Sequence, residues 1–157
     1  MWRFAAAKSA LDQAGEFVPV EQAERRNLIM VNPIEGNVYA TSRNIVAAYQ
    51  MVKAGETARS HRHTAAAINY FFSGSGFSIV DGKKYAWQAG DLMLTAPGWA
   101  IHNHSSYNES VYELTIQDSP LNIAMGSLMW QEDLKHPMEA LGATGGFSTN
   151  REAVPQR

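Results

Sequence analysis

Short apolar stretches that alternate with turn-forming residues dominate the chain from residue 38 to residue 117. These stretches have the length and composition of β-strands. Glycine, asparagine or aspartate separates most of them, and the Asp81-Gly82 pair is a strong hairpin signal. Many short strands at this spacing favour a β-sandwich or β-barrel over alternating strands and helices. The expected strands are 38–41, 44–53, 65–72, 77–80, 83–87, 92–95, 100–104 and 110–117.

Helical patterns are expected on both sides of the β region. Residues 2–14 place apolar side chains on one face and are followed by Gly15, a residue type that commonly ends helices. A second, shorter helical piece is expected at residues 21–26. After the strands, Asp118-Ser119-Pro120 is typical of a helix start, because proline is favoured in the first turn. These helices would pack against the outside of the β domain.

Length and composition agree with one globular domain. The 157 residues are 45% hydrophobic and 18% charged, which is an ordinary balance for a chain that buries a core. After Trp130 the sequence becomes rich in glycine, proline and polar residues. We therefore predict a single domain over residues 1–132 with an N-terminal helical arm, followed by an extended C-terminal tail over residues 133–157.

Charge, cysteine content and hydropathy exclude several classes of function. The formal net charge is −2 and no basic cluster occurs, which argues against binding to nucleic acid. The absence of cysteine excludes a disulfide scaffold, a thiolate nucleophile and a Cys-ligated zinc site. Residues 1–14 lack the apolar core of a signal peptide, and no stretch has the length of a transmembrane helix. We therefore expect a cytoplasmic protein that binds neither nucleic acid nor membranes.

Histidine carries the strongest chemical signal in the chain. Four of the five histidines form two His-x-His pairs, His61 with His63 and His102 with His104. Because alternate side chains of a strand share a face, each pair can direct both imidazoles toward one point. Histidines that point inward from antiparallel strands can bind Fe(II), Mn, Ni, Cu or Zn, so the ligand type alone does not choose the metal. The alternative is that these are ordinary core or surface histidines.

The residues around these histidines resemble the cupin pattern, in which G-x5-H-x-H is followed by a later G-D…P…H. More narrowly, His61-Arg62-His63-Thr64, Gly90-Asp91 and Pro97-x-Trp99-x-x-His102-x-His104 are similar to the N-terminal cupin domain of gentisate 1,2-dioxygenases. The likeness covers about residues 2–118. It implies a small antiparallel jelly-roll barrel with short flanking N-terminal and C-terminal helices. Members of that family usually carry two cupin domains, and this chain has room for one.

The resemblance also implies roles for the histidines. His61, His63 and His102 would bind one divalent metal per chain, with Fe(II) expected and Mn, Ni or Zn as alternatives. His104 would point inward without binding metal and would contact the substrate. A histidine there can accept a proton from a bound phenol or stabilise a developing charge.

Other expected pocket residues are inward-facing positions or match the family. Asn69 stands where the family commonly has an arginine that binds the substrate carboxylate, so a neutral ring is expected to suit the site better than gentisate unless another cation reaches in. Arg59 is the nearest candidate in sequence outside the His-x-His pair. Ala65 would leave space beside the metal, and Gln50 and Trp99 would line the substrate cavity.

From this resemblance we expect a metal-dependent dioxygenase that cleaves a small hydroxylated aromatic with O2 and lacks the carboxylate-binding arginine. A homodimer or larger homo-oligomer is expected. Two alternatives stay open. The first is a redox-neutral isomerase or lyase that uses Mn, Ni or Zn as a Lewis acid, and the second is a non-catalytic ligand-binding cupin.

Overall fold

Antiparallel strands build the part of the chain that the computed structural model describes, which is residues 1–23, 25–95 and 98–132. A five-stranded sheet has the order β1-β2-β9-β4-β7, a three-stranded sheet has the order β6-β5-β8, and β10 pairs with β3. The strands are β1 (Arg26–Ile29), β2 (Val46–Val52), β3 (Arg62–His63), β4 (Ala67–Ser73), β5 (Ser75–Val80), β6 (Lys83–Gln88), β7 (Leu92–Thr95), β8 (His102–Ser106), β9 (Val111–Gln117) and β10 (Trp130–Gln131). The helices are α1 (Phe4–Phe17), α2 (Val20–Ala23) and α3 (Ser119–Ala124).

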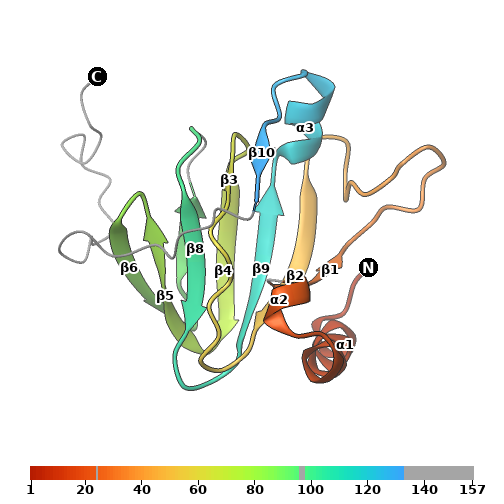
Figure 1. Ribbon diagram of the computed structural model, residues 1–157. Helices are drawn as coiled ribbons and strands as arrows, with labels where there is room; N and C mark the ends of the chain where they lie inside the picture. Colours follow the sequence, from red (N-terminus) through yellow and green to blue (C-terminus); the bar gives the residue numbers. More distant parts are fainter. Residues whose placement is uncertain (24, 96–97, 133–157) are drawn as a thin grey trace.

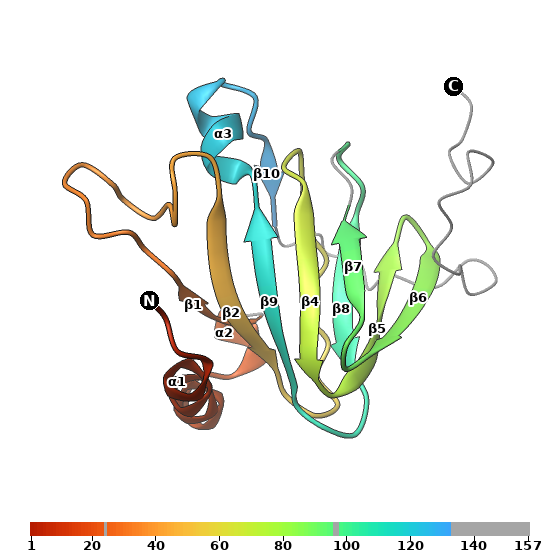
Figure 2. The same ribbon diagram turned by 180° about the vertical axis from the view of Figure 1, so that it is seen from behind.

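The two larger sheets curve around a common interior, and the helices lie outside it. Helix α1 lies beside the lower ends of β1 and β2, and α3 lies at the opposite end, next to β10 (Figure 1). Seen from behind, β4 and β7 continue toward β8 and β5 of the smaller sheet (Figure 2). The predicted all-β fold with short flanking helices is confirmed. None of the described helices is long and apolar enough to cross a membrane.

Alternation along one segment decides which side chains enter the interior. Residues 61, 63, 65, 67 and 69 are buried, and the residues between them are half-buried or exposed. This period of two is the pleat of an extended chain. It carries both histidines of the first pair, Ala65 and Asn69 inward.

Helix α1 packs on the larger sheet through an aromatic and aliphatic cluster. Leu11 is buried with Met51 and Tyr112, and Phe4 packs against this group. The helix continues past Gly15 to Phe17, so the predicted end at residue 14 is wrong. A Cβ on Gly15 would lie 2.6 Å from Met51 Cε, which shows that this glycine permits close packing of helix on sheet instead of ending the helix.

A second cluster packs side chains from the two larger sheets against each other. The rings of Phe71 and Trp87 stack with centroids 3.9 Å apart, beside Met93 and Val111. Gly76 makes room for this stack, because a Cβ there would collide with the Trp87 ring and with the Ser105 carbonyl oxygen. The position of Trp87 matters for the site described below.

Several short elements differ from the sequence prediction. Residues 38–41 form no strand, and the helix expected over 21–26 is limited to α2, because Arg26 already begins β1. Arg26 is held there by hydrogen bonds to the Val18 carbonyl and an ion pair with Glu56. These tertiary contacts allow residues 26–29 to pair with the edge of β2 as a strand. Local sequence propensity does not indicate them. The predicted tail, residues 133–157, lies outside the described residues.

Candidate metal centre

Three histidines converge where β3 meets β8. The backbones of His61 and His102 bond reciprocally, with N–H···O distances of 3.0 and 2.9 Å, and His63 follows two residues after His61 on the same face. One nitrogen from each imidazole lies within 4.8 Å of the others. All three side chains are at most 2% exposed.

Backbone carbonyls orient all three rings in the same way. Nδ1 of His61 lies 3.3 Å from the Arg59 carbonyl, Nδ1 of His63 lies 2.7 Å from that of Ala65, and Nδ1 of His102 lies 3.0 Å from that of Ala100. Because a carbonyl only accepts, each Nδ1 carries the hydrogen and each Nε2 keeps its lone pair.

The Nε2 atoms therefore form a donor set for a cation. Nε2 of His63 is buried and has no hydrogen-bond partner among the described residues. An orphaned lone pair in a buried site is costly unless a ligand satisfies it. Three neutral imidazoles suit Fe(II), Mn, Ni and Zn alike, so these residues fit a divalent metal without choosing it.

Burial keeps these imidazoles neutral. It lowers the pKa of His61 well below 6.5, lowers the pKa of His63, and lowers the pKa of His102 to about 4. A neutral imidazole is the form that binds metal. The site is therefore ready to bind metal at neutral pH.

Arg25 brings a positive charge to the centre, and the sequence analysis missed it. Both of its terminal nitrogens lie 3.3 Å from Nε2 of His61 and can only donate, so this lone pair accepts from the guanidinium here. A metal bound at His61 Nε2 would replace that hydrogen bond. Arg59, the cation that the sequence favoured, instead donates to the Glu21 carbonyl. Arg25 immediately precedes β1, and no local pattern indicates that it points inward.

Trp130 covers the histidines and is the second residue that the sequence analysis missed. Its ring stacks on His63 with centroids 4.8 Å apart and on His61 at 5.8 Å. It is brought there by β10, which pairs Trp130 with His63. A two-residue strand has no sequence signal of its own.

His104 has the opposite tautomer to the three other histidines. Trp87 Nε1, which is only a donor, lies 3.0 Å from Ser78 Oγ, so the hydroxyl accepts from the indole. The hydroxyl could accept a second bond, but Ser78 is 0% exposed and its hydrogen has no other acceptor among the described residues, so Oγ donates to His104 Nδ1 at 2.7 Å. The His104 hydrogen is therefore on Nε2. Burial lowers the pKa of His104 well below 6.5, so this buried ring is a neutral N–H donor.

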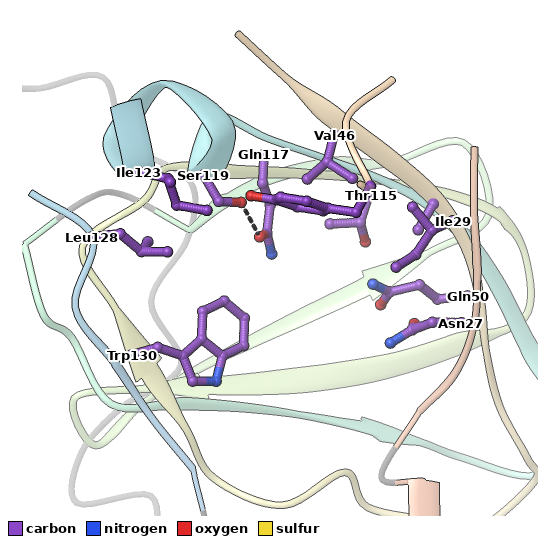
Figure 3. A pocket seen from close by; sticks show the side chains of 12 residues that line it. Asn27, Ile29, Val46, Gln50, Thr115, Gln117, Ser119, Ile123, Leu128 and Trp130 are labelled. Carbon is purple, nitrogen blue, oxygen red and sulfur yellow. Dashed lines mark hydrogen bonds between the residues drawn. The ribbon is translucent and has the colours of Figure 1, made fainter. Parts of the chain in front are cut away.

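A cavity of about 330 Å³ opens beside the centre. Figure 3 shows Trp130 on one side of it, with Gln50 and Asn27 across from it. Thr115 also lines it and donates to Asn69 Oδ1 at 2.7 Å. The lining residues are Asn27, Ile29, Tyr39, Val46, Ala48, Gln50, Thr115, Gln117, Ser119, Ile123, Leu128 and Trp130.

Of the pocket residues predicted from the sequence, only Gln50 lines this cavity directly. Asn69 and Ala65 are buried at 2% and 0% exposure. Trp99 is half-buried and does not line the cavity, and the Arg62 guanidinium lies 4.5 Å from its ring centroid.

Glu113 is a third residue that sequence reasoning missed. It is 1% exposed, and neither carboxyl oxygen has a hydrogen-bond partner among the described residues. Burial raises the pKa of Glu113 to about 7. Only the alternation of β9, which buries Val111, Glu113 and Thr115, could have indicated its inward position.

The buried titratable groups predict how the metal-free protein responds to acid. The unfolded chain protonates each histidine near pH 6.5, whereas burial lowers the folded pKa of all four histidines of the site, to about 4 for His102. Stability is therefore lost as pH falls through this window, by about 2 kcal/mol at pH 5 for His102 alone. Glu113 has the opposite sign, since its folded pKa of about 7 exceeds 4.5 and stability is gained as pH falls.

Because four histidines oppose the single glutamate, we expect a net loss of stability between pH 7 and pH 5. Urea unfolding at the two pH values measures it. Glu113→Gln removes the opposing contribution and should deepen the loss by about 2 kcal/mol. Equal stability at both pH values would contradict buried, neutral imidazoles.

Comparison with known proteins supplies a family context for this geometry. Residues 48–116 match the family model of the cupin domain. A gentisate 1,2-dioxygenase from Ralstonia sp is 41% identical over 123 residues, which cover 76% of this chain and 34% of that protein. A 5-aminosalicylate 1,2-dioxygenase from Comamonas sp is 39% identical over 126 residues, which cover 77% of this chain and 33% of that protein.

Solved structures give the same picture. The crystal structure of a salicylate 1,2-dioxygenase from Pseudaminobacter salicylatoxidans matches with a TM-score of 0.79 at 28% identity, covering 96% of this chain and 42% of that chain. This chain therefore spans about a third of the length of the curated relatives named above and less than half of the structural one.

Proposed function

This chain is a member of the cupin superfamily that resembles the gentisate 1,2-dioxygenases, and we propose that it is a metal-dependent dioxygenase for small hydroxylated aromatics. The observation that carries the proposal is the convergence of three buried Nε2 lone pairs from His61, His63 and His102. One divalent metal per chain, Fe(II) in the first instance, would be held by these atoms. When bound, Fe(II) supplies the redox chemistry that a reaction with O2 requires.

The remaining residues would bind and orient the aromatic. Ala65 leaves space beside the ligand histidines, and Gln50 and Asn69 offer polar groups along the interior. His104 donates its Nε2 hydrogen to a ring oxygen and stabilises negative charge there. Trp99, which lies against the Arg62 guanidinium and does not line the cavity of Figure 3, is proposed as a substrate contact on the family resemblance alone.

Arg25 changes the expected choice of substrate. Asn69 cannot form the bidentate, charge-assisted pair that an arginine forms with a carboxylate. The Arg25 guanidinium, 3.3 Å from a ligand histidine, would provide that charge from the residue just before β1. Rings that carry a carboxylate next to a hydroxyl are therefore the proposed substrates.

Metal analysis and oxygen uptake test the proposal. Protein purified without oxygen should contain about one iron per chain and should consume O2 with salicylate-type or dihydroxylated aromatics. Conversion without oxygen uptake, best supported by Mn, Ni or Zn, would replace the proposal with a redox-neutral isomerase or lyase. A metal-loaded protein that converts none of these aromatics would indicate a ligand-binding cupin.

A homo-oligomer is proposed as the working assembly. The outer face of the larger sheet carries exposed apolar pairs in register, Ile68 with Leu94 and Tyr70 with Leu92. Such contiguous apolar surface is typical of protein contacts. Light scattering of the purified chain measures the assembly, and a monomer at all concentrations would contradict it.

Replacing Arg25 with glutamine should weaken binding of carboxylated aromatics by roughly 10- to 100-fold, because a charge-assisted pair is lost in a buried site. A neutral catechol should lose little, since it has no carboxylate. The ratio of KM values for the two ligand types measures the effect. Arg43→Gln, at an exposed arginine, is the matched control. An equal loss for both ligand types would assign Arg25 to the architecture of the centre.

A further inference from the structure

Glu113 is buried in the interior, and its carboxyl group has no hydrogen-bond partner in the part of the chain that the structure describes. Its strand, β9, lies between β2 and β4, which place Gln50 and Phe71 directly beside it in register. The side chain is 1% exposed, and both oxygens lack a hydrogen bond to any described residue.

Carboxylates with a structural role in this protein are bonded. Glu56 accepts from Arg26 and from the Lys53 backbone N–H, and Asp118 accepts from the Ala66 backbone N–H and from Asn122. Asp91 accepts from the Gln88 backbone N–H. A buried carboxyl group without such partners is costly, so the hydrogen bonds that Glu113 lacks among the described residues leave it available to a bound ligand.

Glu113 lies next to residues that line the cavity beside the metal centre, and apart from the metal ligands. Gln50, its neighbour across β2, and Thr115, two residues along β9, both line the cavity of Figure 3. The charge of Arg25 acts on Glu113, as it does on the ligand histidines. Glu113 is nevertheless outside the cluster of nitrogens that could hold the metal.

We propose that Glu113 determines specificity by bonding a hydrogen-bond donor on the aromatic ligand, an amino or hydroxyl group away from the oxygens that face the metal and Arg25. This inference rests on the proposed function, and it specifies which substituent the aromatic substrate carries. The positive charge of Arg25 lies beside the ligand histidines. The Glu113 carboxyl group, which has no hydrogen-bond partner among the described residues, lies in another part of the interior. The complementary ligand has an acidic group at one end and a donor at the other. Amino substituents are favoured over hydroxyl, because two N–H donors can meet two carboxyl oxygens.

Direct binding to the full, metal-loaded chain under anaerobic conditions tests this pairing. The probes are salicylate, which has no second donor, and its 5-hydroxyl and 5-amino derivatives. We expect the unmodified protein to bind the 5-amino compound roughly 10- to 100-fold more tightly than salicylate. Glu113→Gln should reduce this ratio to a few-fold, and Glu113→Met should bring it to about one.

Thermal unfolding gives a readout that a structural role would not produce. Because methionine removes an unsatisfied buried group at similar volume, Glu113→Met should raise Tm by roughly 2–8 °C while it abolishes the preference. Glu109→Gln, which removes an exposed carboxylate, should keep both the preference and Tm.

The outcomes separate the two proposals. If Glu113→Met keeps the unmodified ratio, the assignment of Glu113 is overturned while the proposed dioxygenase stands. A lower Tm with an unchanged ratio would likewise make Glu113 structural. If none of the three aromatics binds the metal-loaded unmodified protein, both proposals fall.

Discussion

Replacing His102 with alanine should empty the metal centre, lowering metal affinity by more than about 100-fold. The reason is geometric. His102 supplies one of only three Nε2 lone pairs in the cluster, and its ring is oriented by the Ala100 carbonyl at 3.0 Å. Without His102, only His61 and His63 remain, and both lie on one short segment, so the metal loses its ligand from β8. Elemental analysis of the purified variant, after dialysis at matched metal concentration, measures the loss.

Folding has to be controlled in that experiment. His102 also forms the backbone bridge to His61, which an alanine preserves because it involves only main-chain atoms. Circular dichroism of the variant should therefore match the unmodified protein. A folded His102→Ala variant that retains full metal would remove His102 from the ligand set.

Replacing His104 with alanine should lower kcat by about 10²-fold while metal content stays near normal. His104 lies outside the ligand cluster, and Ser78 holds it as an Nε2–H donor. Its loss would therefore remove stabilisation of charge on the substrate and not the metal itself. Steady-state oxygen uptake together with metal analysis distinguishes the two effects.

Two further variants sharpen the test. His104→Gln keeps an N–H donor on a more flexible arm and should recover part of the rate. Ser78→Ala removes the hydroxyl that sets the tautomer, so it should lower kcat less than His104→Ala and alter the pH profile of kcat. Loss of metal from His104→Ala would make His104 a ligand, and unchanged turnover would make it a bystander.

The local pattern of the chain predicted most of the β framework and the two His-x-His pairs, and the family resemblance implied which three histidines bind metal. Alternation is a property of the extended backbone, so the inward positions 61, 63, 65, 67 and 69 follow from a single known inward residue. The helix start at Asp118-Ser119-Pro120 is equally local, and α3 begins at Ser119. These features depend on neighbours within a few residues.

The residues that complete the site are set by contacts between distant segments, which the sequence does not display. Arg25 reaches His61 across 36 residues, and Trp130 covers His63 only because β10 pairs with β3. The helix α1 passes Gly15 because Met51 packs there. In each case local propensity is weak, and the free energy comes from burial against a partner that folding brings near.

The electrostatic state of the centre belongs to the tertiary structure as well. The sequence does not show how far the pKa of a histidine or glutamate shifts in the folded protein. Burial lowers the pKa of His102 to about 4 and raises the pKa of Glu113 to about 7. The tautomer of His104 depends on Ser78 and Trp87, brought together by the pairing of β5 with β6 and β8. The sequence by itself determined which residues can bind a metal. Only the fold decided which of their nitrogens are free to do so, because desolvation and hydrogen-bond partners exist only once the sheets have closed.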